Sequence, residues 1–239
     1  MKLVIFCVIL SVALAEYPSN LPKCSQNDEP CHTKAGQTFV DNYSGGLKDI
    51  HLLPFDPFHI KSMGLKRDPT SPVNIELEFT DMDMFGMKTM KVLSAKILDF
   101  GSRSELEGLI PSLTLKGHYS IDGRVLVLPI VGEGDSEIKC KNTYFKYSYD
   151  MKPVEKNGKK YASLEHVKLE IKPELVQFHF ENLFRGDKNL GDNMNKFLNE
   201  NWNDIFQEIK PRFAKALSLE VKALLNTFYS KYPYEEYFQ

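Results

Sequence analysis

The sequence predicts an α+β fold in which a long C-terminal helix is wrapped by a highly curved antiparallel sheet. Segments 72–80 and 112–122 alternate apolar and polar residues, as strands with one buried face do. Asp122-Gly123 and Asn157-Gly158 are residue pairs typical of β-hairpin turns. In the last fifth of the chain, apolar residues instead recur every three or four positions, as on one face of a helix.

The central part of the chain contains further strand candidates. The run 125–131 is apolar on both faces, so we expect it to lie centrally or to be covered at an opening. Segment 138–151 changes phase after Cys140, which predicts a one-residue bulge between Lys141 and Thr143. Other segments are expected to form strands on weaker patterns or by position: 57–66, 87–100, 159–171 and 175–182.

The C-terminal helix is expected to begin at Asp192 as N-cap and to end near Ser230. This span is about 40 residues, or roughly 55 Å at the α-helical rise. Pro211 must kink the helix or interrupt its hydrogen-bond ladder. A helix in a coiled coil would also carry an apolar stripe along its length. Large aromatic residues, however, fit poorly in the heptad seam of a coiled coil. A curved sheet wrapped along the helix suits them better.

The N-terminal residues predict export. Residues 1–15 read as a signal peptide, because a short apolar run after Lys2 ends in Ala13-Leu14-Ala15. The run is shorter than the ~20 residues that span a membrane, so we expect no stable membrane insertion. Residues 16–239 are expected to form a single domain in the extracellular space. The chain has 30 basic and 32 acidic residues, a balance that gives no reason to expect a nucleic-acid partner.

Three cysteines remain after the predicted signal peptide. Cys24 and Cys31 are the expected disulfide pair in an oxidising compartment. Cys140 is then left as a buried free thiol or as an intermolecular link. Asn42 heads the sequon Asn42-Tyr43-Ser44, which predicts glycosylation if the residue is exposed. The soft and imidazole ligands are too few and too scattered to predict a metal site.

The sequence gives no support for catalysis. It lacks the nucleophile elbow, the zinc-protease helix and the phosphate-binding loop, and its histidines are scattered. We therefore predict that the protein is not an enzyme and uses no cofactor.

Several short motifs, in this order and spacing, carry a family resemblance. They are Cys24 and Cys31, Asp56-Pro57-Phe58, the segment 126–134, and the stretch 182–191 followed by 198–202. Together they resemble the insect takeout and haemolymph juvenile hormone-binding family, across essentially all of residues 16–239. The chain has no cysteine from 141 onward, so the second disulfide typical of the hormone-binding members cannot form. The resemblance is therefore nearer to the takeout branch.

The resemblance implies that the curved sheet and long helix enclose an elongated apolar tunnel. It also implies a monomeric, secreted carrier of a small hydrophobic molecule, such as a terpenoid hormone, a fatty-acid-like molecule or another lipid. Haemolymph or a sensory fluid is the expected location, and a circadian or chemosensory role would fit. The alternative is an extracellular signalling or interaction protein, with an unidentified receptor, whose internal lipid is structural.

The candidate wall residues are aromatic and aliphatic side chains on the inferred inward faces. They are Phe79, Tyr119, Ile121, Val127, Phe145, Tyr147, Phe178 and Phe180 from the strands, and Phe197, Trp202, Phe206, Ile209 and Phe213 from the helix. Tyr119, Tyr144 and Tyr149 are the candidate polar contacts, because a phenol can offer one hydrogen bond from an apolar wall. A filled core would show the same pattern, so the residues alone do not separate a core from a tunnel.

Overall fold

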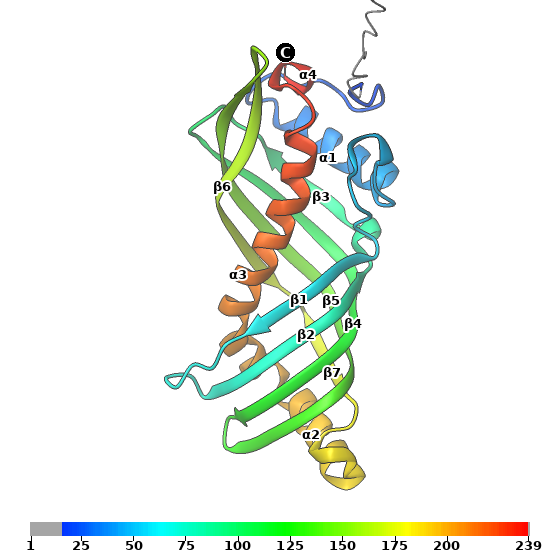
Figure 1. Ribbon diagram of the computed structural model, residues 1–239, viewed down its shortest axis with the longest axis vertical. Coiled ribbons are helices and arrows are strands. Elements are labelled where there is room, and N and C mark those ends of the chain that lie inside the picture. Colours follow the sequence, from blue (N-terminus) through cyan, green and yellow to red (C-terminus); the bar gives the residue numbers. More distant parts are fainter. Residues whose placement is uncertain (1–15, 239) are drawn as a thin grey trace, which may run out of the picture.

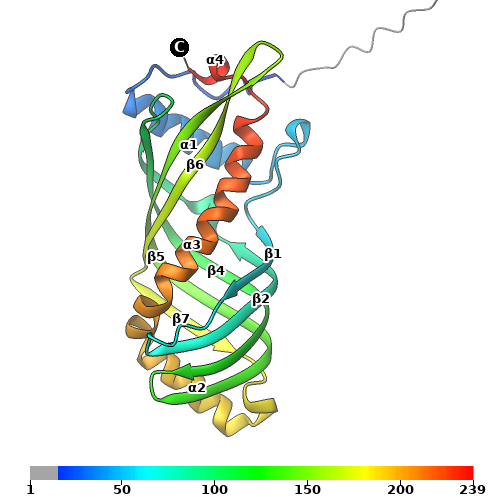
Figure 2. The ribbon, with the colours of Figure 1, turned by 60° about the vertical axis from the view of Figure 1, so that its left-hand side comes forward.

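A computed structural model describes residues 16–238, so the predicted signal peptide lies outside the described residues. The molecule is elongated, with one curved antiparallel sheet and the helix α3 (Trp202–Tyr229) running along much of its length (Figure 1, Figure 2). The helix α1 (Glu29–Tyr43) and the C-terminal segment lie at one end, which we call the α1 end. The helix α2 (Lys188–Glu200) lies at the opposite end, the α2 end. The predicted α+β class, with a long C-terminal helix against a curved antiparallel sheet, is confirmed.

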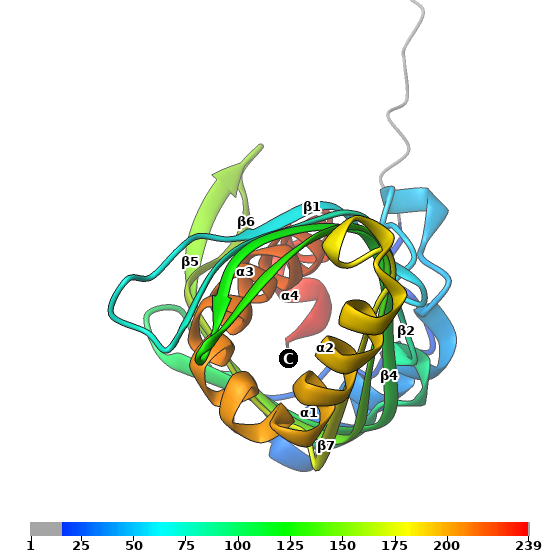
Figure 3. The same ribbon diagram turned by 90° about the horizontal axis from the view of Figure 1, so that it is seen from below.

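Two long strands form the backbone of the sheet. Strand β4 (Arg103–Val125) pairs along its whole length with β5 (Leu128–Lys156), which extends beyond it from Met151 onward. Strands β2 and β7 flank them toward the α2 end, and β3 and β6 flank them toward the α1 end. The bounds of the other strands are β1 Phe58–Leu65, β2 Val73–Phe85, β3 Lys91–Lys96, β6 Lys159–Lys172 and β7 Leu175–Phe180. The sheet is not closed, and α3 and α2 complete the ring of elements seen from below (Figure 3).

The first predicted hairpin exists, but its turn was misplaced. Val125 pairs with Leu128, so the turn is Leu126-Val127, and Asp122-Gly123 lies within β4. Gly123 serves a different purpose there: its φ is 144° and a Cβ would lie 2.3 Å from the carbonyl oxygen of Asn74 on β2. The glycine therefore permits close approach of two strands. The second predicted hairpin is confirmed, with Asn157-Gly158 between β5 and β6.

The change of phase in β5 is real, but the predicted one-residue bulge was wrong. Asn142 has a φ of 43°, and the buried residues switch from Cys140 to Thr143 and Phe145 around it. The β4–β5 register does not shift there, because β4 changes phase at the directly opposite Pro111. In both strands the side chains that point inward therefore change parity at the same place. At this place the second neighbour of β5 changes from β7 to β6.

The C-terminal helix begins earlier and breaks elsewhere than predicted. Its N-cap is Asp187, whose carboxylate accepts a hydrogen bond from the backbone N–H of Leu190, so Asp192 lies inside α2. The chain breaks at Asn201, between α2 and α3, while Pro211 lies within α3. Both the backbone N–H and the side-chain amide of Asn201 donate to the carbonyl oxygen of Phe197, at 3.1 and 2.8 Å. Asn201 is thus the C-cap residue of α2.

Helix α2 covers the outer edge of β7 through two asparagines. The Asn199 amide accepts from the backbone N–H of Phe178 and donates to its carbonyl oxygen, both at 2.8 Å. Asn195 makes the same pair of bonds with Phe180, both at 2.9 Å. The side chains therefore satisfy backbone groups that another strand would otherwise pair.

The two terminal segments meet at the α1 end. The backbone N–H of Cys24 donates to the carbonyl oxygen of Tyr237 at 3.2 Å. The predicted disulfide between Cys24 and Cys31 is confirmed, and it ties this segment to α1. Cys140 is a buried free thiol, and burial raises its pKa to about 12. In residues 16–238 no helix is both long and apolar enough to cross a membrane.

Candidate functional site: two apolar cavities

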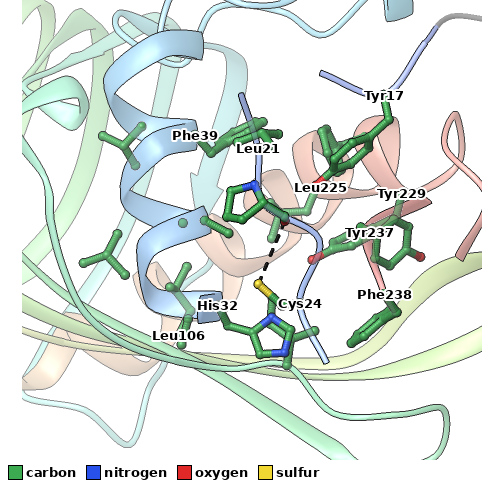
Figure 4. Close-up of a pocket in the computed structure, with 18 of the residues that line it drawn as sticks. Tyr17, Leu21, Cys24, His32, Phe39, Leu106, Leu225, Tyr229, Tyr237 and Phe238 are labelled. Carbon is green, nitrogen blue, oxygen red and sulfur yellow. Dashed lines mark hydrogen bonds between the residues drawn. The ribbon is translucent and has the colours of Figure 1, made fainter. Parts of the chain in front are cut away.

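A cavity of about 150 Å³, the first cavity, lies at the α1 end of the molecule (Figure 4). Its wall combines α1, the N-terminal segment, strands of the sheet, the last turns of α3 and the C-terminal segment. Its lining includes Tyr17, Cys24, His32, Gly36, Tyr149, Tyr229, Tyr237 and Phe238. The terminal segments thus close a space that the sheet and the two helices leave open.

A second cavity of about 140 Å³ adjoins the first and lies deeper between the sheet and α3. Its wall is apolar, and Met84 and Met87 contribute flexible side chains. Both cavities are lined by the same dividing residues: Phe39, Val40, Met90, Leu106 and Leu225. Two neighbouring cavities, separated by these side chains, therefore lie where a continuous tunnel was expected.

The walls of both cavities are uncharged. Among the described residues that line them there is no Lys, Arg, Asp or Glu. His32 is 3% exposed and donates from Nε2 to the carbonyl oxygen of Ser25, 3.1 Å away. Burial lowers the pKa of His32 below its ordinary value of 6.5, so the ring is neutral at neutral pH. The cavities therefore suit apolar groups, each 100 Å² of which contributes about 2.5 kcal/mol when removed from water.

The buried His32 predicts acid sensitivity. Because its folded-state pKa lies below the ordinary value of 6.5, the unfolded chain takes up the proton first as the pH falls. The stability contribution is therefore present above about pH 6.5 and is lost as the pH falls below it. We expect melting temperatures measured between about pH 7.5 and 5.5 to fall less steeply in His32→Gln than in wild type. His179→Gln, at an exposed position, is the control and should leave the pH dependence of the melting temperature as in wild type. If the pH dependence is also unchanged in His32→Gln, burial of a neutral His32 is not the cause of the acid sensitivity.

The structure brings only some of the predicted wall residues to the cavities. Phe145 and Tyr147 line the second cavity, and Tyr149 lines the first. The others that remain inside pack in the core without lining either cavity: Phe79, Tyr119, Ile121, Phe178, Phe180 and Phe206 are buried, and Phe197, Trp202, Ile209 and Phe213 are half-buried. Val127 is 82% exposed at the hairpin turn, so its placement on the wall was wrong.

The three predicted polar contacts have different surroundings. Tyr119 donates its hydroxyl to the carbonyl oxygen of Glu181 at 2.6 Å, and burial raises its pKa to about 12. Tyr144 donates to the carboxylate of Glu107 at 2.6 Å on the outer face of the sheet. Tyr149 lines the first cavity, and its hydroxyl is hydrogen-bonded to that of Tyr229. All three hydroxyls are therefore engaged within the protein.

Sequence reasoning missed the contribution of the two terminal regions. Phe39 on α1 and Tyr237 and Phe238 near the C-terminus line the first cavity but were not among the candidates. Two signals pointed to them: the disulfide that fixes the segment before α1, and the aromatic-rich stretch after residue 227. Asn42 is exposed near the end of α1, so its glycosylation remains a prediction. The described residues contain no cluster of three His, Cys, Asp or Glu side chains suited to a metal ion.

A long helix lies against an open, strongly curved antiparallel sheet, with uncharged cavities between them. This arrangement is typical of proteins that bind small hydrophobic molecules. The chain belongs to the haemolymph juvenile hormone binding protein family, whose model matches residues 3–239. The family is one of binding proteins, and the resemblance found in the sequence motifs is confirmed.

Relatives and a solved structure agree with this membership. The chain is 26% identical over 230 residues to the circadian clock-controlled protein daywake of Drosophila melanogaster, covering 93% of this chain and 88% of that protein. The Drosophila yakuba protein of the same name matches with the same figures. The crystal structure of Takeout 1 from Epiphyas postvittana superposes with a TM-score of 0.80 at 25% identity, covering 91% of this chain and 99% of that one.

Proposed function

We propose that this protein is a secreted carrier that binds a small hydrophobic ligand in the two adjoining cavities. The observation that carries the proposal is the pair of uncharged, largely apolar cavities enclosed between the sheet, α1 and α3. Membership of a hormone-binding family supports a ligand of this kind. The disulfide Cys24–Cys31 and the signal-peptide pattern of residues 1–15 support secretion.

The sizes of the cavities constrain how such a ligand would be held. A cavity of roughly 150 Å³ in another protein accommodates a molecule the size of benzene. Each cavity here is of that order, so one alone suits only a fragment of a lipid. A longer ligand would occupy both cavities and displace the side chains that separate them. Phe39 is the aromatic member of that partition, and Met90 is its unbranched, conformationally adaptable member.

Extraction and mass spectrometry of the protein secreted from insect cells test the proposal first. We expect a stoichiometric apolar molecule that is absent from a similarly purified non-binding protein. An apolar fluorescent probe should displace it and should raise the melting temperature of the protein. At a free concentration of about 100 times its Kd, a ligand adds about 2.7 kcal/mol to the stability.

Two outcomes would count against a carrier. Empty protein that binds none of several apolar probes would mean that the cavities are packing defects. A bound molecule that no probe displaces would instead support an extracellular interaction protein with a structural lipid.

A further inference from the structure

We propose that Gly108 on β4 determines the size of the second cavity and therefore which ligands that cavity admits. The inference rests on the proposed carrier function and adds the residue that sets the selectivity of one cavity. Gly108 is buried and does not itself line the cavity. It acts through Phe145, its direct partner on β5, whose ring forms part of the cavity wall.

The ring of Phe145 occupies the space that a side chain at position 108 would fill. A Cβ added to Gly108 would lie 2.6 Å from Cε1 and 2.7 Å from Cζ of the Phe145 ring. Non-bonded carbon atoms pack at about 3.5–4.0 Å, so the ring and a side chain at position 108 could not both take these positions. The ring therefore lies close against the backbone of β4 because residue 108 has no side chain.

The neighbours of Gly108 on the inner face of the sheet are large. Side chains alternate between the two faces of a strand, so the inward positions on either side of Gly108 are Leu106 and Ile110. Both of these residues line the second cavity. Glycine in the middle of a strand is ordinarily less favourable than alanine, and it often marks a place where another group approaches the backbone closely. Here the approaching group is the ring of Phe145.

A larger side chain at position 108 would displace the ring into the second cavity. The contacting atoms are at the free end of the Phe145 side chain, which moves by rotation about χ1 and χ2. Strand β4 lies on one side of the ring and the second cavity lies on the other, so the ring moves toward the cavity. A space of about 140 Å³ is of the size that holds one benzene molecule, so a displaced ring takes up much of it. The added Cβ would also lie 2.8 Å from the carbonyl oxygen of Lys91 on β3, so Gly108→Ala strains that backbone as well.

Benzene binding followed by methyl NMR tests the proposal on the full secreted protein. The methyl groups of Met84 and Met87 report on the second cavity, and those of Ala35 and Ala95 report on the first. In wild type we expect benzene to shift both sets of signals. In Gly108→Ala the affinity reported by the methionines should fall by at least about tenfold, because the remaining space is too small for a benzene ring. The affinity reported by the alanines should stay as in wild type.

A second glycine of β4 provides the matched control. A Cβ at Gly117 would lie 2.7 Å from Cα of Met82, a clash like that at Gly108, but neither Gly117 nor Met82 lines a cavity. Gly117→Ala should therefore leave benzene binding at both cavities unchanged. The double variant Gly108→Ala/Phe145→Leu should recover the affinity of the second cavity to within about threefold of wild type, because the ring is gone while the contact with Lys91 remains.

Phe145→Leu alone tests the same geometry without strain at position 108. Removing the ring should enlarge the second cavity, so naphthalene should bind this variant at least about fivefold more tightly than wild type. The inference is overturned, and a carrier remains, if Gly108→Ala keeps wild-type affinity at the methionines or loses no more than Gly117→Ala. Lack of recovery in the double variant, or unchanged naphthalene binding in Phe145→Leu, also overturns it. If benzene shifts neither set of methyl signals in wild type, the carrier function is overturned as well.

Discussion

Replacing Gly86 with alanine is expected to destabilise the protein by more than about 3 kcal/mol, a large share of the stability of an ordinary domain. Gly86 follows β2 with a φ of 106°, and an added Cβ would lie 2.0 Å from the carbonyl oxygen of Ser112 on β4. That contact is with backbone, so it can be relieved only by moving β4. Strain of about 1–3 kcal/mol from the left-handed conformation adds to the clash. Secretion yield and urea unfolding measure the effect.

Gly101 provides the control that separates the clash from the strain. Its φ is 80°, but a Cβ there would meet nothing within 4 Å. Gly101→Ala should therefore lose only the conformational preference of glycine, about 1 kcal/mol. If the two variants lose equal stability, close packing against Ser112 is not the reason for glycine at position 86.

Replacing Phe39 with alanine is expected to join the two cavities. The ring of Phe39 lines both of them, is stacked on Phe55 at 5.7 Å and meets Phe228 edge-on at 5.4 Å. Loss of a core phenylalanine costs about 3–5 kcal/mol, part of it for the cavity left behind. The ring is half-buried here, so we expect about 2–4 kcal/mol in the ligand-free protein. A ligand long enough to fill the joined space should restore much of that loss.

Melting temperatures with and without alcohols of increasing chain length measure this effect. We expect Phe39→Ala to favour longer chains than wild type, because no ring has to be displaced. Phe100→Ala serves as the control, since Phe100 packs on Tyr234 at 4.5 Å and lines neither cavity. It should lose stability without a change in preferred chain length. An unchanged preference in Phe39→Ala would show that this ring does not divide the binding space.

Local patterns predicted the elements better than their ends. The strand alternation of segment 72–80 and the Asn157-Gly158 turn depend on neighbours in the sequence, and both are present in the structure. Asp122-Gly123 was misread because a glycine needed for close strand approach has the same sequence signature as a turn glycine. Val127 was misread for a related reason: an apolar residue in a two-residue turn cannot be told from one in a buried strand.

The candidate site was predicted less completely, because inward orientation does not determine where packing is loose. Phe79 and Phe145 both point inside, but only Phe145 lines a described cavity. The difference depends on how α1, α3 and the terminal segments fill the ends of the sheet, which involves contacts between residues far apart in the chain.

The asparagine pairs on β7 bear on how the protein behaves at high concentration. An open edge strand offers unpaired backbone groups that can recruit a strand from another molecule and start aggregation. Asn195 bonds the backbone N–H and C=O of Phe180, and Asn199 bonds those of Phe178. These backbone groups are therefore not available to a strand from another molecule. The open sheet is therefore protected along β7 against the addition of a strand from another molecule.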